Sequence, residues 1–180
     1  VSIAPGEFVA IMGPSGSGKT TLLNLLSGLD KPTSGRVNAP GRKKRAFVFQ
    51  DYNLLESLNA QRNATLTARF SGRRPARGKV AEVFNSFGLA GLERRLPAQL
   101  SGGQQQRVAV ARALLAQAPY IFADEPTGAL DDATASTVLS HLRAAARDGA
   151  SVVMVTHSHL AAEAADRIIS LEEVAHAGVA

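Results

Sequence analysis

The chain has 180 residues, 45% of them hydrophobic, which is enough for one domain with a sizeable buried core. It contains no Cys, which excludes a disulfide framework, a thiolate metal site and a Cys nucleophile, so any metal must be a hard ion held by oxygen. Its apolar runs fall far short of the ~20 residues that cross a bilayer, and its first residues lack the pattern of a secretory signal. These features predict a soluble, cytoplasmic chain.

The formal net charge is +5, and much of it lies in two short basic clusters, at residues 41–45 and 73–79. Such clusters can contact nucleic acid or an anionic membrane surface. Both contain Gly or Pro and neither contains an aromatic residue, which favours solvated turns over a binding surface.

Strand-like and helix-like segments alternate along the chain. Short apolar runs at 7–12, 45–50, 120–125 and 151–157 alternate with helical patterns at 20–29, 104–117, 132–147 and 159–166. This alternation predicts an α/β fold, with a mainly parallel sheet covered by helices and a ligand site at the carboxyl ends of its strands. From residue 51 the alternation gives way to an Arg-rich, helix-prone stretch, which we interpret as an inserted α-helical subdomain.

The first strand-like run ends at Gly13, where Gly-Pro-Ser-Gly-Ser-Gly-Lys-Thr begins. Its glycines permit close approach of backbone amides to phosphates, Lys19 adds a charge for the β and γ phosphates, and the Thr20 hydroxyl can ligate Mg²⁺. The same spacing could serve a plain tight turn, but its place between an apolar strand and a leucine-rich helix favours a phosphate-binding P-loop. The predicted nucleotide-binding residues here are Gly13, Pro14, Ser15, Gly16, Ser17, Gly18, Lys19, Thr20 and Thr21.

Two adjacent acids, Asp124 and Glu125, follow the apolar run that starts at Tyr120. Phosphoryl transfer needs a second metal-binding carboxylate and a group that orients the attacking water. Asp124 suits the first role, and Glu125 suits the second as a general base. Adjacent acids at a strand end can instead cap the next helix, but the upstream phosphate loop favours catalysis.

A second glycine-containing motif, Leu-Ser-Gly-Gly-Gln, starts at Leu100. Ser101 is a plausible helix N-cap with Gln104 as its capping-box partner. Two glycines after a capping Ser also make an anion-binding nest. One domain cannot easily apply two nests to one triphosphate, whereas a second copy can supply the other.

The phosphate loop, Gln50, the Leu100 motif, Asp124-Glu125, Gly-Ala-Leu-Asp131 and His157 occur in the order found in ATP-binding cassette (ABC) domains. The chain resembles this family over nearly its whole length. The resemblance implies a homodimer in which each ATP lies between the phosphate loop of one copy and Ser101, Gly102, Gly103 and Gln104 of the other. It also implies that Gln50 touches Mg²⁺ and the nucleotide and senses the transporter, that Asp131 communicates between the sites, and that His157 contacts the γ phosphate. A lone His after a strand would otherwise be read as a structural hydrogen-bonding residue.

Three stretches, 47–58, 97–107 and 124–131, look like the branch that contains lipoprotein-releasing, macrolide-exporting and antimicrobial-peptide-exporting systems. This resemblance implies an ATP hydrolase at the inner face of the cell membrane, bound to integral membrane subunits. Membrane contact then occurs through those partners only, and no nucleic acid is expected. The cassette does not contact the substrate, so the sequence does not identify it.

Three departures from the family pattern stand out. The chain begins close to the phosphate loop, without the upstream strand whose aromatic residue stacks on adenine, and the segment from Gly35 to Arg45 is short. Ala129 stands where many relatives have Asn or Ser. We expect one domain over 1–180, with the core at 1–50 and 108–180 and the helical subdomain at about 51–107. Two alternatives remain open: a soluble cassette ATPase acting on nucleic acid or ribosomes, and a nucleotide-binding module without efficient turnover.

Overall fold

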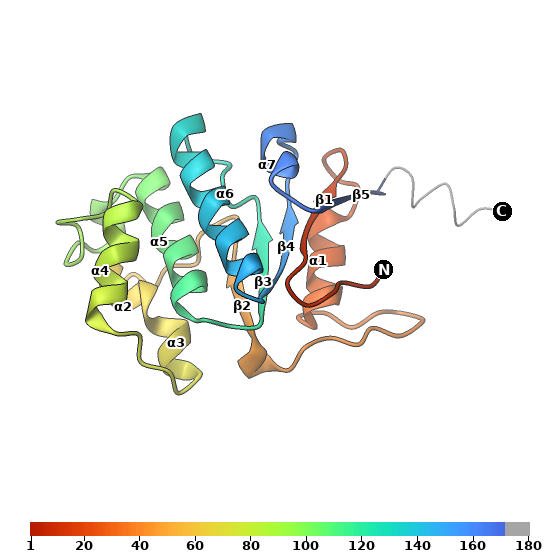
Figure 1. The fold of residues 1–180 in the computed structure, drawn as a ribbon, viewed down its shortest axis with the longest axis horizontal. Coiled ribbons are helices and arrows are strands. Elements are labelled where there is room, and N and C mark those ends of the chain that lie inside the picture. Colours follow the sequence, from red (N-terminus) through yellow and green to blue (C-terminus); the bar gives the residue numbers. More distant parts are fainter. Residues whose placement is uncertain (172–180) are drawn as a thin grey trace.

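The structure, a computed structural model, describes residues 1–171. Five strands form one parallel sheet in the order β2-β3-β4-β1-β5 (Figure 1). The strands are β1 (Phe8–Met12), β2 (Arg45–Val48), β3 (Tyr120–Asp124), β4 (Ser151–Val155) and β5 (Arg167–Ser170). The α-helices are α1 (Lys19–Ser27), α2 (Ala60–Ala64), α3 (Leu66–Phe70), α4 (Arg77–Ser86), α5 (Gly102–Leu115), α6 (Asp132–Arg147) and α7 (His159–Glu163), with 3₁₀ turns η1 (Arg42–Lys44) and η2 (Pro97–Gln99).

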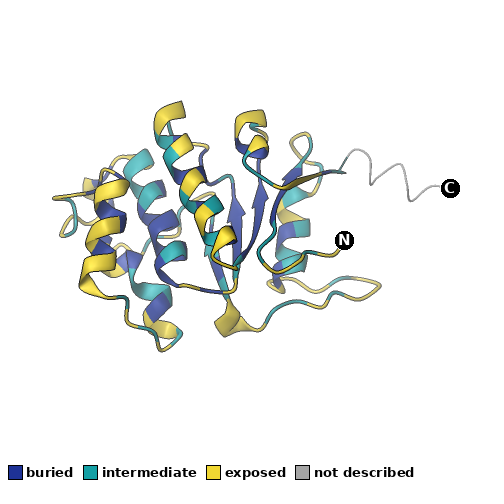
Figure 2. Cartoon of the chain, in the orientation of Figure 1, coloured by how far each residue is buried: buried dark blue, intermediate teal, exposed yellow. Residues whose placement is uncertain are grey.

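The two faces of the sheet are covered by different helices. Side chains alternate between faces along a strand, so Phe8 and Ala10 of β1 point to one face and Val9 and Ile11 to the other. The first face packs against α5, α6 and α7, and the second against α1. Figure 2 shows the strands buried between these layers, with exposed residues on the outer faces of α4 and α6. The predicted α/β fold with a parallel sheet is confirmed.

The predicted helical region contains three short helices that pack on α5. Helices α2, α3 and α4 all contact α5, and α5 also contacts β2 (Figure 1). The expected boundary between helical subdomain and core, at residues 107 and 108, falls inside the continuous helix α5. The division of the chain into these two parts therefore stays a prediction.

Several element boundaries differ from those expected. Helix α5 begins at Gly102, two residues before the predicted start, because Ser101 is its N-cap. Helix α1 ends at Ser27, because Gly28 adopts a left-handed conformation at φ 72° and closes the helix with backbone hydrogen bonds. Strand β5 was not predicted. Between Gly35 and Arg45, where β2 begins, the only regular element is the turn η1, and every strand pairing in the described residues is parallel. Within residues 1–171, no helix is long and apolar enough to cross a membrane.

Candidate active site

The carboxyl ends of β1, β3 and β4 lie side by side. Val155 at the end of β4 is paired with Ile11 on one side and with Asp124 on the other, so these three strands end level with one another. A cavity of about 630 Å³ opens at this edge. It is lined by Ser15, Gly16, Gly18, Lys19, Thr20, Thr21, Gln50, Asp124, Glu125, Val155 and His157. The structure thus brings together the predicted P-loop, strand-end acids, Gln50 and His157.

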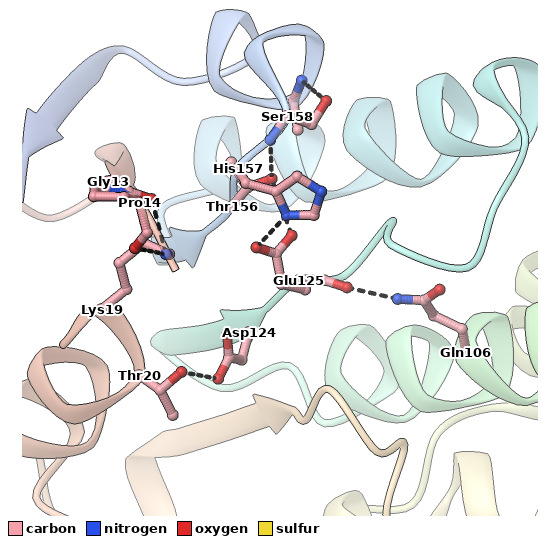
Figure 3. Close-up of polar contacts among 11 residues, drawn as sticks. Gly13, Pro14, Lys19, Thr20, Gln106, Asp124, Glu125, Thr156, His157 and Ser158 are labelled. Atoms are coloured by element: carbon pink, nitrogen blue, oxygen red, sulfur yellow. Dashed lines mark hydrogen bonds and ion pairs between the residues drawn. The ribbon is translucent and has the colours of Figure 1, made fainter. Parts of the chain in front are cut away.

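The phosphate loop wraps around its own lysine. The Lys19 ammonium donates hydrogen bonds to the carbonyl oxygens of Gly13 and Pro14, both at 2.8 Å (Figure 3). Gly16 and Gly18 have φ angles of 79° and 89°, a left-handed conformation that side chains disfavour, and no heavy atom lies within 4 Å of where a Cβ would stand. The loop therefore has the positive charge and the open, side-chain-free surface that a triphosphate needs.

Thr20 and Asp124 meet at the floor of the cavity. The Thr20 hydroxyl donates a 2.8 Å hydrogen bond to the carboxylate of Asp124, a residue that is only 6% exposed (Figure 3). Burial raises the pKa of the Asp124 carboxyl above its ordinary value, and Glu125 adds to the rise, whereas the Thr20 hydrogen bond and the Lys19 charge oppose it. A hydroxyl and a carboxylate at this distance form a hard-oxygen donor pair, which fits Mg²⁺.

Glu125 is held by residues at the end of β4. One carboxylate oxygen lies 2.8 Å from the His157 ring Nδ1, and the other accepts a 3.3 Å hydrogen bond from the Thr156 hydroxyl (Figure 3). The Glu125 side chain is 15% exposed, whereas that of His157 is 74% exposed. An oriented, largely buried carboxylate beside an exposed imidazole has the geometry for proton transfer at the cavity wall. The sequence did not point to Thr156.

Gln50 lines the cavity and precedes a loop with an unusual backbone. Tyr52 and Asn53 both have positive φ, at 61° and 46°. Their carbonyl oxygens accept hydrogen bonds from the guanidinium of Arg112 in α5, at 2.7 and 2.6 Å. Arg112 is buried and was not among the predicted functional residues.

The Ser101 motif lies outside this cavity. Within residues 1–171, the lining of the cavity does not include Ser101, Gly102, Gly103 or Gln104. The predicted capping box is present: the Ser101 hydroxyl accepts from the Gln104 amide at 3.3 Å, and the Gln104 side-chain carbonyl accepts from the Ser101 amide at 2.9 Å. The motif therefore starts helix α5, and its exposed residues Ser101 and Gly102 lie outside the cavity that holds the phosphate loop of the same chain.

Asp131 caps helix α6. Its carboxylate accepts hydrogen bonds from the backbone amide and the hydroxyl of Thr134, at 2.9 and 2.8 Å, and these bonds lower the pKa of the Asp131 carboxyl. The structure thus gives Asp131 a capping role, and its role between sites stays a prediction.

The two basic clusters differ in structure. Arg42, Lys43 and Lys44 make the exposed turn η1. In the second cluster, Arg73 donates to backbone carbonyl oxygens after α5, and Lys79 pairs with Glu82 at 2.8 Å. The interpretation as a turn is therefore supported for the first cluster, whereas Arg77, Gly78 and Lys79 of the second cluster form the first turn of helix α4.

Known proteins are similar to this chain in sequence and in fold. The profile of the family described as "ABC transporter" matches residues 1–128. The Macrolide export ATP-binding/permease protein MacB of Azoarcus sp. (strain BH72) is 42% identical over 96% of this chain, and that of Rhodopseudomonas palustris (strain HaA2) is 44% identical over 96%. The chain spans 29% of the length of each of these relatives.

Solved structures that resemble this chain belong to the same family as the sequence relatives. The dimeric structure of MJ0796, a bacterial ABC transporter cassette, has a TM-score of 0.85 and is 41% identical, with 94% of this chain and 83% of that chain covered. A dimeric post-hydrolysis state of the same cassette, bound to ADP and Pi, has a TM-score of 0.84 at the same identity and coverage. The predicted resemblance, including its macrolide-exporting branch, is confirmed. The chain belongs to the ABC transporter family.

Proposed function

We propose that this chain drives a membrane transporter by hydrolysing MgATP in a head-to-tail dimer, at the inner face of the cell membrane. The observation that carries the proposal is the separation of the two anion-binding motifs: the phosphate loop lines the 630 Å³ cavity, and the Ser101 motif does not. A second copy can bring its Ser101 motif to that cavity. The MJ0796 cassette, with the same fold, is dimeric in both structures.

Each cavity residue has a proposed role in hydrolysis. Lys19 and the loop amides hold the β and γ phosphates and stabilise the charge on the transferring phosphoryl group. Glu125 takes the proton from a water molecule as the water oxygen attacks the γ phosphorus and the bond to the leaving ADP oxygen breaks. His157 stabilises the γ phosphate and orients Glu125, from which it is 2.8 Å distant.

Thr20, Asp124 and Gln50 are proposed to hold Mg²⁺. When bound, Mg²⁺ neutralises phosphate charge during transfer. Among residues 1–171, no group of three or more His, Cys, Asp or Glu side chains could hold a metal ion. A site built from one hydroxyl, one carboxylate and one side-chain amide oxygen agrees with the preference of Mg²⁺ for taking its remaining ligands from phosphates and water.

The partners of the whole transporter are also proposed. The MacB relatives are ATP-binding/permease proteins, so each unites a cassette with a permease in one chain. By analogy, the present cassette works with membrane-embedded permease segments, and the membrane is contacted through them.

Replacing Glu125 by Gln tests the catalytic assignment. Loss of the general base should slow ATP hydrolysis by roughly 10²- to 10⁴-fold, while ATP affinity stays close to that of the wild type. Single-turnover hydrolysis measured beside equilibrium ATP binding separates these effects. Wild-type turnover in Glu125→Gln would contradict the assignment.

A further inference from the structure

The side-chain amide of Gln106 lies buried between helix α5 and the segment that follows β3. Gln106 is 1% exposed. Its amide nitrogen donates a 2.6 Å hydrogen bond to the backbone carbonyl oxygen of Glu125 (Figure 3). Its side-chain oxygen accepts a 2.8 Å hydrogen bond from the backbone amide of Ala129. One side chain thus fixes both ends of the segment from Glu125 to Ala129.

The backbone at Glu125 needs such support. Its φ is 47°, in the left-handed region that non-glycine residues seldom adopt because it strains the backbone. The Glu125 amide donates to Val155 at 2.9 Å, and its carbonyl oxygen also accepts from Gly128 at 3.2 Å. Because the backbone conformation sets the direction of the side chain, the groups that hold this φ also determine where the Glu125 carboxylate points.

The same helix end carries the Ser101 motif. A Cβ added to Gly103 would stand 3.2 Å from the carbonyl oxygen of Ala129, so the helix start and this segment are in close contact. Gln106 lies two residues beyond Gln104 on this helix. A shift of the start of α5 relative to β3 would therefore strain or break a hydrogen bond of the Gln106 amide.

We propose that Gln106 is a positioning residue for Glu125, which holds the carboxylate in its hydrolytic orientation and ties it to the helix that carries the Ser101 motif. The inference rests on the proposed role of Glu125 as general base. It assigns a function to a buried glutamine that touches neither the cavity nor the proposed metal ligands.

Two substitutions test it in the full chain. Gln106→Met keeps the side-chain length but removes both hydrogen bonds. Gln106→Glu keeps the acceptor for Ala129 and places an oxygen where the donor to Glu125 stood. Misplacement of a catalytic group by about 1 Å costs roughly 10²-fold, so we expect single-turnover hydrolysis to slow by roughly 10- to 100-fold in both variants, with ATP affinity within about threefold of the wild type. Lowering the pH should bring the hydrolysis rate of Gln106→Glu closer to that of the wild type, because a protonated carboxyl can again donate a hydrogen bond to the Glu125 carbonyl oxygen.

Gln105→Met is the matched control. The Gln105 amide donates at 3.1 and 3.2 Å to the carbonyl oxygens of Pro97 and Leu100, so this variant loses two hydrogen bonds on the same helix but none to Glu125. We expect its hydrolysis rate to stay within about threefold of the wild type.

A double variant separates the proposal from its premise. If Gln106 acts through Glu125, adding Gln106→Met to Glu125→Gln should slow hydrolysis by less than about twofold. Wild-type hydrolysis in Glu125→Gln alone would refute the general-base role on which the inference rests. If Glu125→Gln is slow, the inference is overturned by any of three results: a wild-type rate in Gln106→Met, an equal slowing in Gln105→Met, or a multiplicative effect in the double variant.

Discussion

Replacing Arg112 by Met should release the loop that follows Gln50. The variant keeps an unbranched side chain in the buried space but loses the two hydrogen bonds to Tyr52 and Asn53. Both acceptors lie in left-handed backbone, at φ 61° and 46°, so the guanidinium holds a conformation that is unfavourable by itself.

The magnitude follows from these contacts. Hydrogen bonds from a charged donor contribute about 1.5–3 kcal/mol each, or about 3–6 kcal/mol for the pair. Burial lowers the pKa of Arg112, which shows that its charge is poorly solvated, and relief of that cost offsets part of the loss. We therefore expect a net loss of about 2–4 kcal/mol in the free energy of unfolding, or a fall in Tm of roughly 4–16 °C.

Denaturant unfolding measures this loss, and amide hydrogen exchange locates it. Exchange should accelerate at Tyr52 and Asn53 more than in the strands, because the released loop opens locally. Arg94→Met is the control: Arg94 is exposed, and its replacement should change the free energy of unfolding by less than about 0.5 kcal/mol. If Arg112→Met unfolds at the same denaturant concentration as Arg94→Met, the guanidinium does not hold the loop.

Two further changes probe conformation and charge. In Gly28→Ala, the new Cβ would stand 2.8 Å from the Cβ of Ala39 at a φ of 72°, so we expect thermal unfolding to show a loss of about 1–3 kcal/mol. Gly72→Ala, at φ 76° with no atom within 4 Å, should lose less, and equal losses would refute the steric part of the explanation. Burial lowers the pKa of His141 from 6.5, Lys79 lowers it further and Glu82 opposes them. His141 therefore binds its proton more tightly in the unfolded chain than in the folded one, and the free energy of unfolding should fall as the pH drops below 6.5. Tm measured from about pH 7 to about pH 5 should fall less in His141→Gln than in the wild type; parallel profiles would exclude His141 as the source.

Much of the fold and most of the cavity lining could be predicted from the sequence, because the informative residues stand at strand ends. Gly13, Asp124 and His157 each follow an apolar run, and the carboxyl ends of parallel strands meet at one edge. Strand β5 was missed because it has four residues, half of them exposed, and so lacks a buried apolar run.

The supporting residues were harder to find. Gln106 lies three and four residues before Ala109 and Val110, on the buried side of α5, and Arg112 interrupts an apolar run. A polar residue at such a position signals a buried hydrogen bond, but only the fold reveals its partner. The partners of Gln106 and Arg112 come from loops 19 to 60 residues away in the chain, a relation that helical periodicity does not contain.

The structure of one chain does not determine how two copies are arranged. The Ser101 motif caps its own helix with hydrogen bonds that form with or without a partner copy. Its capping box is complete within the chain. The absence of Cys from the sequence permits a direct test, because single cysteines can be introduced without side reactions. Ser15 in the phosphate loop and Ser101 are both exposed, and Ser→Cys is a small change at each.

The most direct test of the composite site is therefore a crosslink between two single-cysteine chains. Ser15→Cys and Ser101→Cys are each made in a Glu125→Gln background, which slows hydrolysis, and the two chains carry tags of different size. Under mild oxidation with MgATP, the mixed sample should give a disulfide-linked dimer containing one chain of each kind. Without nucleotide that dimer should be scarce. Crosslinks only between identical chains, or none at any ATP concentration, would contradict a site shared by the phosphate loop of one copy and the Ser101 motif of the other.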